Sequence, residues 1–421
     1  MANDRRLTVK YSDLLYVFAL FLVYTESFIC SLYNVLFPGG MNGLIYIIVG
    51  MLVLIYLNKP ALIRFRVSRS NIAFCFLTSA ICVIIAQSIS GSTSLWTNLK
   101  YILIYLSILC CLDNEKWIRP FFGMSMICSL VFIVTTIWLY FDTNSFYSLF
   151  AYNLYPYGLF DYYLGKGITS GITDHYSHNG IMLANSLILW VSCFVGEDRP
   201  KKKKIILVVL LLNLVAMIMC GKRGQVVAPI IAVMCAMIVL YRILHSTGRL
   251  AKLILSAALI ISIVYVASIF SPVLDNYLSR FSGLESDGTL MARYVYWALA
   301  LNQFVKNPVT GMGWLQFRTI NPDGNDPHNI YIQILCETGI VGALVFGAFY
   351  LSALVVAYRN LEKIASNNKS NQIDRRNCFF AFAGQISFLV YGLSGNPQTL
   401  YYSLIPYLLS CAIAYNYKNK L

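Results

Sequence analysis

The sequence carries little charge. Only 12% of its 421 residues are Asp, Glu, Lys or Arg, whereas 58% are hydrophobic, and its mean hydropathy is +0.66. A soluble protein of this length carries about 25% charged residues. This shortage argues against a soluble domain with a single anchor, and it disfavours a large soluble core of many buried helices. We therefore expect the whole chain to be an integral membrane protein.

Several motifs with known chemistry are also missing. None of the 12 cysteines has the CxxC spacing, and almost all lie in apolar runs, so we expect neither a disulfide framework nor a zinc site. The sequence has no P-loop, GxGxxG, GxSxG or HExxH motif, and without the first two we expect no cytoplasmic nucleotide chemistry. The outer segments lack a DxD motif, which argues against a metal-dependent glycosyltransferase. We expect no cofactor and no metal.

Apolar runs long enough to cross a membrane recur along the chain, which predicts an all-α polytopic membrane protein of about 12 transmembrane helices. The first run has no small-residue cleavage site, so we expect it to be a retained span rather than a signal peptide. The expected spans are 12–35, 42–58, 71–89, 98–112, 119–141, 179–196, 204–220, 224–241, 252–270, 330–357, 377–394 and 400–416.

Most of the 32 basic residues fall in alternate connecting segments, as cytoplasmic loops of membrane proteins do. This asymmetry predicts an even number of spans with both termini in the cytoplasm. Anionic lipid then explains the net charge of +14 without nucleic acid. The lysine run 201–204 fits a topology determinant better than a phosphoinositide or nucleic-acid patch. The basic residues left for the outer face or the helices are Lys100, Lys166, Lys222, Arg223, Arg280, Arg293, Lys306 and Arg318.

Two long outer segments, 142–178 and 271–329, interrupt what we expect to be a single membrane domain, 1–421. Long polar and aromatic loops are usually functional rather than merely connective. Within the second, residues 289–305 have helical periodicity and no helix breaker. We expect an amphipathic helix at the membrane interface, with Tyr294 at headgroup level.

The outward-facing cations are candidate ligands for an anionic group. Lys222 and Arg223 stand between two glycines in a turn joining two apolar spans. Glycine lets backbone N–H groups approach a phosphate, and guanidinium binds it with two hydrogen bonds. The alternative for Arg223 is a basic side chain that snorkels from a helix end. Arg293 lies on the expected interfacial helix, where it could equally anchor that helix to lipid phosphate.

His328 stands at the mouth of a span, after a proline that restricts its position. Imidazole is the side chain best suited to accept a proton near neutral pH. Asn329, Gln333 and Glu337 follow four residues apart, so they share one helix face, which should turn away from lipid. The alternative is a structural polar seam between helices.

A second cluster of polar residues ends the first long outer segment. Asp174, His175 and His178 form an acidic residue beside an HxxH pattern. Metal binding needs a third strong ligand, which is not evident, so an ordinary loop or a substrate cavity fits better than a metal site.

The order of these features resembles the O-antigen ligase and polymerase superfamily of bacterial envelope membrane proteins. The features are the Arg223 turn, the helix with Arg293, an Asn-Pro-Val-Thr-Gly-Met-Gly-Trp turn, and the Pro-His-Asn stretch that carries His328 into a span. The resemblance covers roughly residues 205–357, and the rest is similar only in hydrophobicity and topology. Lys222 departs from the pattern, because many relatives carry a small residue there.

The resemblance implies a GT-C-like, metal-independent, inverting glycosyltransferase in the bacterial inner membrane, with its active site facing the periplasm. The implied donor is a glycan linked to undecaprenyl diphosphate, and the acceptor is another glycan or lipid A–core. Arg223 and Arg293, with Lys222, would hold the diphosphate, and His328 would activate the acceptor hydroxyl. Other implied partners are membrane lipids and a chain-length regulator, but no nucleic acid.

The resemblance does not separate the two reactions of the superfamily. A polymerase joins lipid-linked repeat units, whereas a ligase transfers the finished polymer to lipid A–core, and both need the same donor site. The overall character of the chain favours an O-antigen polymerase over a ligase. A lipid-linked oligosaccharide flippase is a further alternative, which the lack of matching halves with paired helix breaks disfavours.

Overall fold

A computed structural model of the protein describes residues 10–36, 44–63, 71–90, 95–154, 167–173, 175–242, 248, 288–367 and 370–418. The described residues form helices and no strands. The helices are α1 (Tyr11–Leu36), α2 (Leu44–Ile63), α3 (Ile72–Ala86), the 3-10 turn η1 (Gln87–Ser90), α4 (Leu95–Cys111), α5 (Ile118–Phe141), α6 (Thr143–Leu154), α8 (Tyr176–Gly196), α9 (Pro200–Cys220), α10 (Arg223–Leu240), α13 (Gly288–Lys306), α14 (Phe317–Ile320), α15 (Ile330–Ser366), α16 (Gln372–Tyr391) and α17 (Tyr401–Lys418).

The structure confirms the expected all-α membrane architecture. Every expected span coincides with a described helix except 252–270, which lies outside the described residues. Five described helices are long and apolar enough to cross a membrane, and four shorter ones are also apolar. The helix expected at 289–305 is present as α13, and it ends directly before Asn307 and Pro308.

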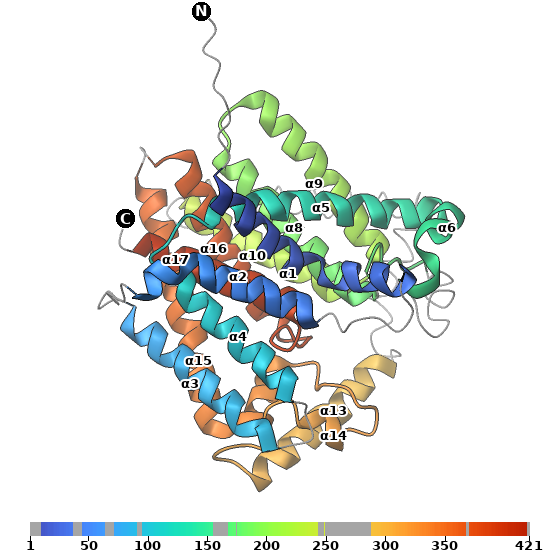
Figure 1. The fold of residues 1–421 in the computed structure, drawn as a ribbon, viewed down its shortest axis with the longest axis vertical. Coiled ribbons are helices and arrows are strands. Elements are labelled where there is room, and N and C mark those ends of the chain that lie inside the picture. Colours follow the sequence, from blue (N-terminus) through green and yellow to red (C-terminus); the bar gives the residue numbers. More distant parts are fainter. Residues whose placement is uncertain are drawn as a thin grey trace, which may run out of the picture.

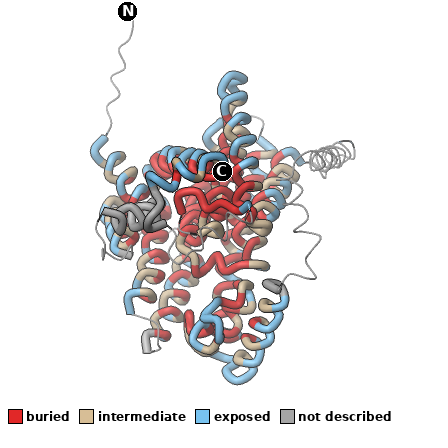
Figure 2. The backbone as a smooth tube through the Cα atoms, turned by 90° about the vertical axis from the view of Figure 1, so that its right-hand side faces the viewer, coloured by how far each residue is buried: buried red, intermediate tan, exposed pale blue. Residues whose placement is uncertain are grey.

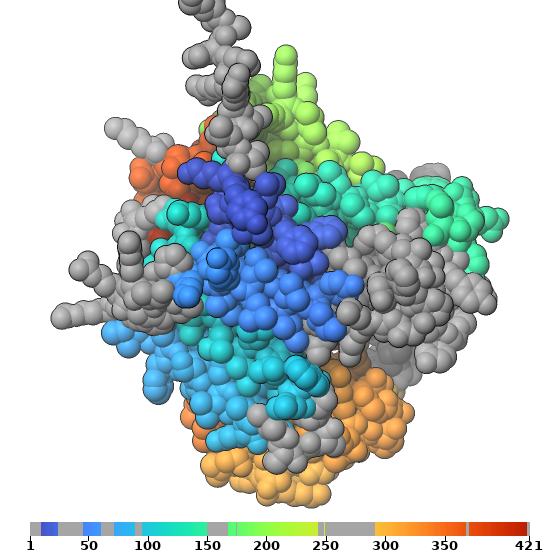
Figure 3. All heavy atoms as spheres, viewed as in Figure 1, coloured from blue at the N-terminus to red at the C-terminus, as the bar shows by residue number. Residues whose placement is uncertain are grey.

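Buried residues concentrate in the middle of the helix bundle (Figure 2). Helix α16 packs against α8, α10, α15 and α17, and nearly every residue of α17 is buried. Helices α13 and α14 lie at one end of the bundle, and α9 reaches the other end (Figure 1). The space-filling view shows the atoms of α13 gathered at that same end, below α3 and α4 (Figure 3). Helices α13 and α14 therefore cap one end of the bundle.

The sequence did not predict a helix in the first long outer segment, yet α6 occupies residues 143–154. Its first turn is capped, because the Asp142 carboxylate accepts a hydrogen bond from the N–H of Ser145 at 3.0 Å. The span expected at 330–357 also extends further, to Ser366. The added residues mix polar side chains with the buried Leu361 and Ile364, and they continue the helix beyond the apolar stretch.

Helix α15 is broken near its start, at Gly339, whose φ of +63° and ψ of −166° are not helical. The segment 308–313, which follows α13, fills the break. The N–H of Gly313 donates to the carbonyl of Glu337 at 2.8 Å, and the N–H of Ile340 donates to the carbonyl of the segment's first residue at 2.9 Å. These bonds satisfy backbone groups that the break removes from the helix ladder. The loop and the broken helix thus form one unit.

The break predicts an unusual sensitivity at Gly339. A Cβ there would come within 2.3 Å of the Val309 carbonyl oxygen, and the positive φ is itself costly for other residues. We expect Gly339→Ala to destabilise the protein by about 2 kcal/mol or more and to lower its thermal unfolding midpoint in detergent. Gly347→Ala is the matched control, because a Cβ at Gly347 in the same helix meets no atom within 4 Å. Equal midpoints for the two variants would show that the break tolerates a side chain.

Candidate active site

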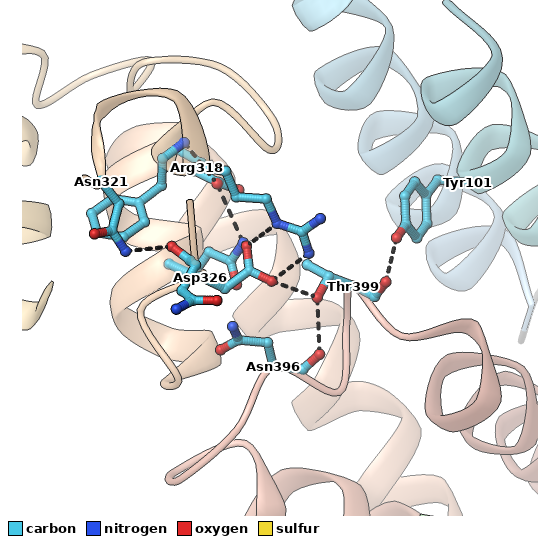
Figure 4. Close-up of polar contacts among 10 residues, drawn as sticks. Tyr101, Arg318, Asn321, Asp326, Asn396 and Thr399 are labelled. Carbon is cyan, nitrogen blue, oxygen red and sulfur yellow. Dashed lines mark hydrogen bonds and ion pairs between the residues drawn. The ribbon is translucent and has the colours of Figure 1, made fainter. Parts of the chain in front are cut away.

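The carboxylate of Asp326 joins three parts of the chain at the end of the bundle (Figure 4). Arg318 donates to it with two hydrogen bonds, from Nε at 2.6 Å and from Nη2 at 2.5 Å. The Gln333 amide of α15 donates to it at 3.3 Å, and the Thr399 hydroxyl, between α16 and α17, donates at 3.2 Å. The carboxylate is 8% exposed, and ion pairing with it raises the pKa of Arg318. This network fixes the segment that leads into α15.

His328 follows two residues later and has a φ of +56°, a conformation that costs a residue with a side chain about 1–3 kcal/mol. Its neighbours on both sides are held. The indole N–H of Trp297 in α13 donates to the Pro327 carbonyl at 2.8 Å, and the N–H of Ile330 donates to the Gly392 carbonyl at 2.9 Å. The surrounding structure therefore determines the position of the imidazole.

Two cations lie close enough to His328 to influence its titration. Burial, the largest cause, and the positive charges of Arg293 and Lys222 together lower the pKa of His328 to about 4. Asp326 opposes this shift, and Arg318 adds to it. The imidazole is therefore neutral at pH 7, with a lone pair available on one nitrogen. The structure thus brings together three candidate residues that the sequence separates by up to 106 positions.

Arg223 is the first residue of α10, directly after Lys222, and Gly221 before them ends α9 with a φ of +68°. The glycine after it, Gly224, packs close to α16: a Cβ there would meet Ser394 Oγ at 3.0 Å. This close approach brings the turn against the end of α16, where Gly392 accepts the hydrogen bond that begins α15. The Lys222 ammonium lies 5.2 Å from the Tyr176 ring centroid.

Of the three residues expected to form a polar stripe along α15, only Gln333 and Glu337 interact with each other. Gln333 donates to Glu337 Oε1 at 3.2 Å, and both side chains are buried, at 1% and 0% exposure. Glu337 Oε1 also accepts from the backbone N–H of Phe317 at 3.3 Å. Asn329 instead caps α15, because its Oδ1 accepts from the N–H groups of Tyr331 and Ile332. Asn329 therefore caps the helix, whereas Gln333 and Glu337 contact each other and the loop that contains Phe317.

The remaining candidates lie in different surroundings. Tyr294 is 52% exposed, with its ring edge-on to Trp297 at 5.4 Å. His175 caps α8 by accepting a hydrogen bond from the N–H of Ser177 at 3.0 Å, and the His178 ring packs against Tyr402 at 4.7 Å. Asp174 lies outside the described residues. Among the described residues, no group of three or more His, Cys, Asp or Glu is arranged to hold a metal ion.

Sequence reasoning missed the residues that position His328. It counted Arg318 among the outer cations without giving it a role, and it did not consider Asp326 or Thr399. The signal available was the short spacing from Arg318 to Asp326, opposite charges eight residues apart in a polar loop. Thr399 lies 73 residues beyond Asp326, and nothing local in the sequence indicates their contact.

A family model described as O-antigen ligase matches residues 180–347. The matched segment runs from the start of α8 into α15, so it contains Lys222, Arg293 and His328. The match supports the superfamily that the sequence motifs resemble, and with it glycosyl transfer in envelope polysaccharide synthesis. No curated protein matches the chain.

The electrostatics of the site predict how His328 titrates. Diethyl pyrocarbonate modifies the neutral form of an imidazole and not the protonated form, so we expect its rate at His328 to stay nearly constant from pH 8 down to about pH 5. Removing the positive charge in Arg293→Gln should raise the pKa and move the loss of reactivity to higher pH, because that charge lowers the pKa of His328. Mass spectrometry of the peptide that contains His328 measures the rate.

Lys306→Gln is the control for this measurement, since it removes an equal charge from the last turn of the same helix. We expect this variant and the unmodified protein to show the same pH dependence of the modification rate at His328. An identical profile in Arg293→Gln and the unmodified protein would show that Arg293 does not act on the imidazole.

Proposed function

We propose that this chain, whose residues 180–347 match the O-antigen ligase family, transfers a glycan from a polyprenyl-diphosphate lipid to a hydroxyl of an acceptor glycan. The observation that carries the proposal is the neutral imidazole of His328 beside Lys222 and Arg293. The imidazole accepts a proton, and the cations bind a diphosphate. Cations that stabilise a leaving anion supply what a metal ion supplies in other glycosyltransferases.

In the proposed reaction the acceptor hydroxyl oxygen attacks the anomeric carbon of the donor sugar. A new C–O bond forms, and the bond from that carbon to the diphosphate oxygen breaks. The electron pair of that bond leaves with the polyprenyl diphosphate, whose negative charge Arg223, Arg293 and Lys222 stabilise. His328 takes the proton of the attacking hydroxyl and later returns it to solvent. A single displacement of this kind inverts the anomeric configuration.

Donor binding should also activate the base. The pKa of His328 is low in the protein alone, partly because Arg293 and Lys222 are positively charged. A bound diphosphate places negative charge beside both cations and compensates them. The pKa of His328 then rises, so the imidazole becomes a stronger base when the donor is present. This coupling favours proton abstraction only when a donor can react.

We further propose that the acceptor is another lipid-linked repeat unit, so the chain is an O-antigen polymerase. The ligase reaction onto lipid A–core requires the same donor chemistry and is the alternative. In either case we place the site on the periplasmic face of the inner membrane with both termini in the cytoplasm, as the distribution of basic residues supports. An undecaprenyl carrier is the donor lipid in this proposal.

The lipopolysaccharide of a strain that lacks the chain tests this proposal on a gel. Core that carries one repeat unit indicates a lost polymerase, whereas bare core with polymer retained on the carrier lipid indicates a lost ligase. We expect the unmodified chain to restore long polymer and His328→Ala to restore none, because removing a general base lowers a rate about 10²–10⁴-fold.

Lys306→Gln, produced at the same level, is the control and should restore wild-type banding. Unchanged banding in the strain that lacks the chain would exclude both reactions. Wild-type polymer in the strain with His328→Ala would exclude His328 as the base.

A further inference from the structure

A cavity of about 560 Å³ lies where α8 ends and where α9 and α16 begin. It is large enough for part of a lipid or a similar ligand. One part of its wall is basic, with Arg199, Lys202 and Arg376, and another part is apolar, with Met126, Trp190 and Cys193.

The cavity is remote from the candidate active site. Helix α8 runs from Tyr176, whose ring lies beside Lys222 of the candidate site, to Gly196, which lines the cavity. Its 21 residues span about 30 Å, at 1.5 Å for each residue. That length equals the thickness of the hydrocarbon core of a bilayer. The cavity and His328 therefore lie near opposite faces of the membrane.

The basic part of the wall has more positive than negative charge. Glu197 is the one carboxylate among its lining residues, and it already pairs with Arg199 at 2.8 Å. Lys202 and Arg376 also line the cavity, and neither has a carboxylate within ion-pair distance in the described part of the chain. Lys202 and Arg376 thus face the cavity without a direct ion pair, and the charge of Lys202 acts on Glu197 only at longer range.

Arg376 is held in place for an anion. Its guanidinium carbon lies 3.9 Å from the centroid of the Phe122 ring, and its Nε donates to Asn377 Oδ1 at 3.0 Å. The ring and the amide fix the plane of the guanidinium without neutralising its charge. The first turns of α9 and α16 also line the cavity, and the amino ends of helices favour negative charge.

The apolar part of the wall lies deeper along the helices. Cys193 and Trp190 are one and two turns before Gly196 on α8, and Met126 and Ile206 face the same space. A free phosphate would leave this apolar surface against water, whereas an acyl chain would cover it. The wall is thus matched to a ligand with an anionic head and an apolar body.

We propose that this cavity binds one anionic phospholipid from the membrane leaflet opposite to the candidate active site. Its phosphodiester lies between Lys202 and Arg376, and the upper part of an acyl chain lies against Trp190 and Cys193. The bound lipid fills the junction of α8, α9 and α16, where α8 packs against the other two helices. This site is independent of the proposed glycosyl transfer.

Native mass spectrometry of the purified full-length protein tests the site with phosphatidylglycerol and phosphatidylcholine as probes. We expect one phosphatidylglycerol to be retained about tenfold more strongly than phosphatidylcholine. The double variant Lys202→Gln with Arg376→Gln should lose that preference. The double variant Lys204→Gln with Arg359→Gln is the matched control, because it removes two charges from residues that do not line the cavity, and it should keep the preference.

A second variant fills the apolar part without changing charge. Cys193→Phe should weaken retention of phosphatidylglycerol about tenfold while the protein stays monodisperse. Several results would overturn the proposal: equal retention of the two lipids by the unmodified protein, equal loss of preference in both double variants, or full retention by Cys193→Phe. Displacement of the lipid by millimolar inorganic phosphate would also overturn it, since the site would then recognise a free anion.

Discussion

The ion pair between Arg318 and Asp326 holds the outer loop, α15 and the α16–α17 connection together. A buried carboxylate requires compensation of its charge, and here a guanidinium, an amide and a hydroxyl supply it from three parts of the chain. His328 is only two residues away, so this network restrains the segment in which its backbone adopts a positive φ. The geometry of the candidate base therefore depends on a residue that does not itself react.

The break in α15 also holds the loop that follows α13 in place. The segment after α13 replaces helical hydrogen bonds at Gly339, and Glu337 accepts a hydrogen bond from the N–H of Phe317 in the loop. The loop after α13, the helix that carries Arg293, is thereby bonded to α15, the helix that follows His328, at two places: the break at Gly339 and the side chain of Glu337. A cation and an imidazole on separate elements can then keep a fixed relation, which electrostatic catalysis requires.

Much of the fold follows from the sequence, because a bilayer requires long apolar runs and retains basic residues on one side. Periodicity also predicted α13 and the shared helix face of Gln333 and Glu337, whose side chains are hydrogen-bonded in the structure. The break at Gly339 was not predicted, since a glycine among apolar residues gives no local signal of a loop that inserts there. The contact of Asp326 with Thr399 depends on tertiary packing between distant segments, which no spacing rule reports.

We propose that His328 and the neighbouring cations form one site for a base and a diphosphate. The most direct test is the pKa of His328 with and without a bound, unreactive polyprenyl diphosphate, measured through its reactivity with diethyl pyrocarbonate. We expect the pKa of His328 to rise above about 4 when the diphosphate binds, because its negative charge compensates Arg293 and Lys222. An unchanged pKa in protein shown independently to have bound the diphosphate would contradict it.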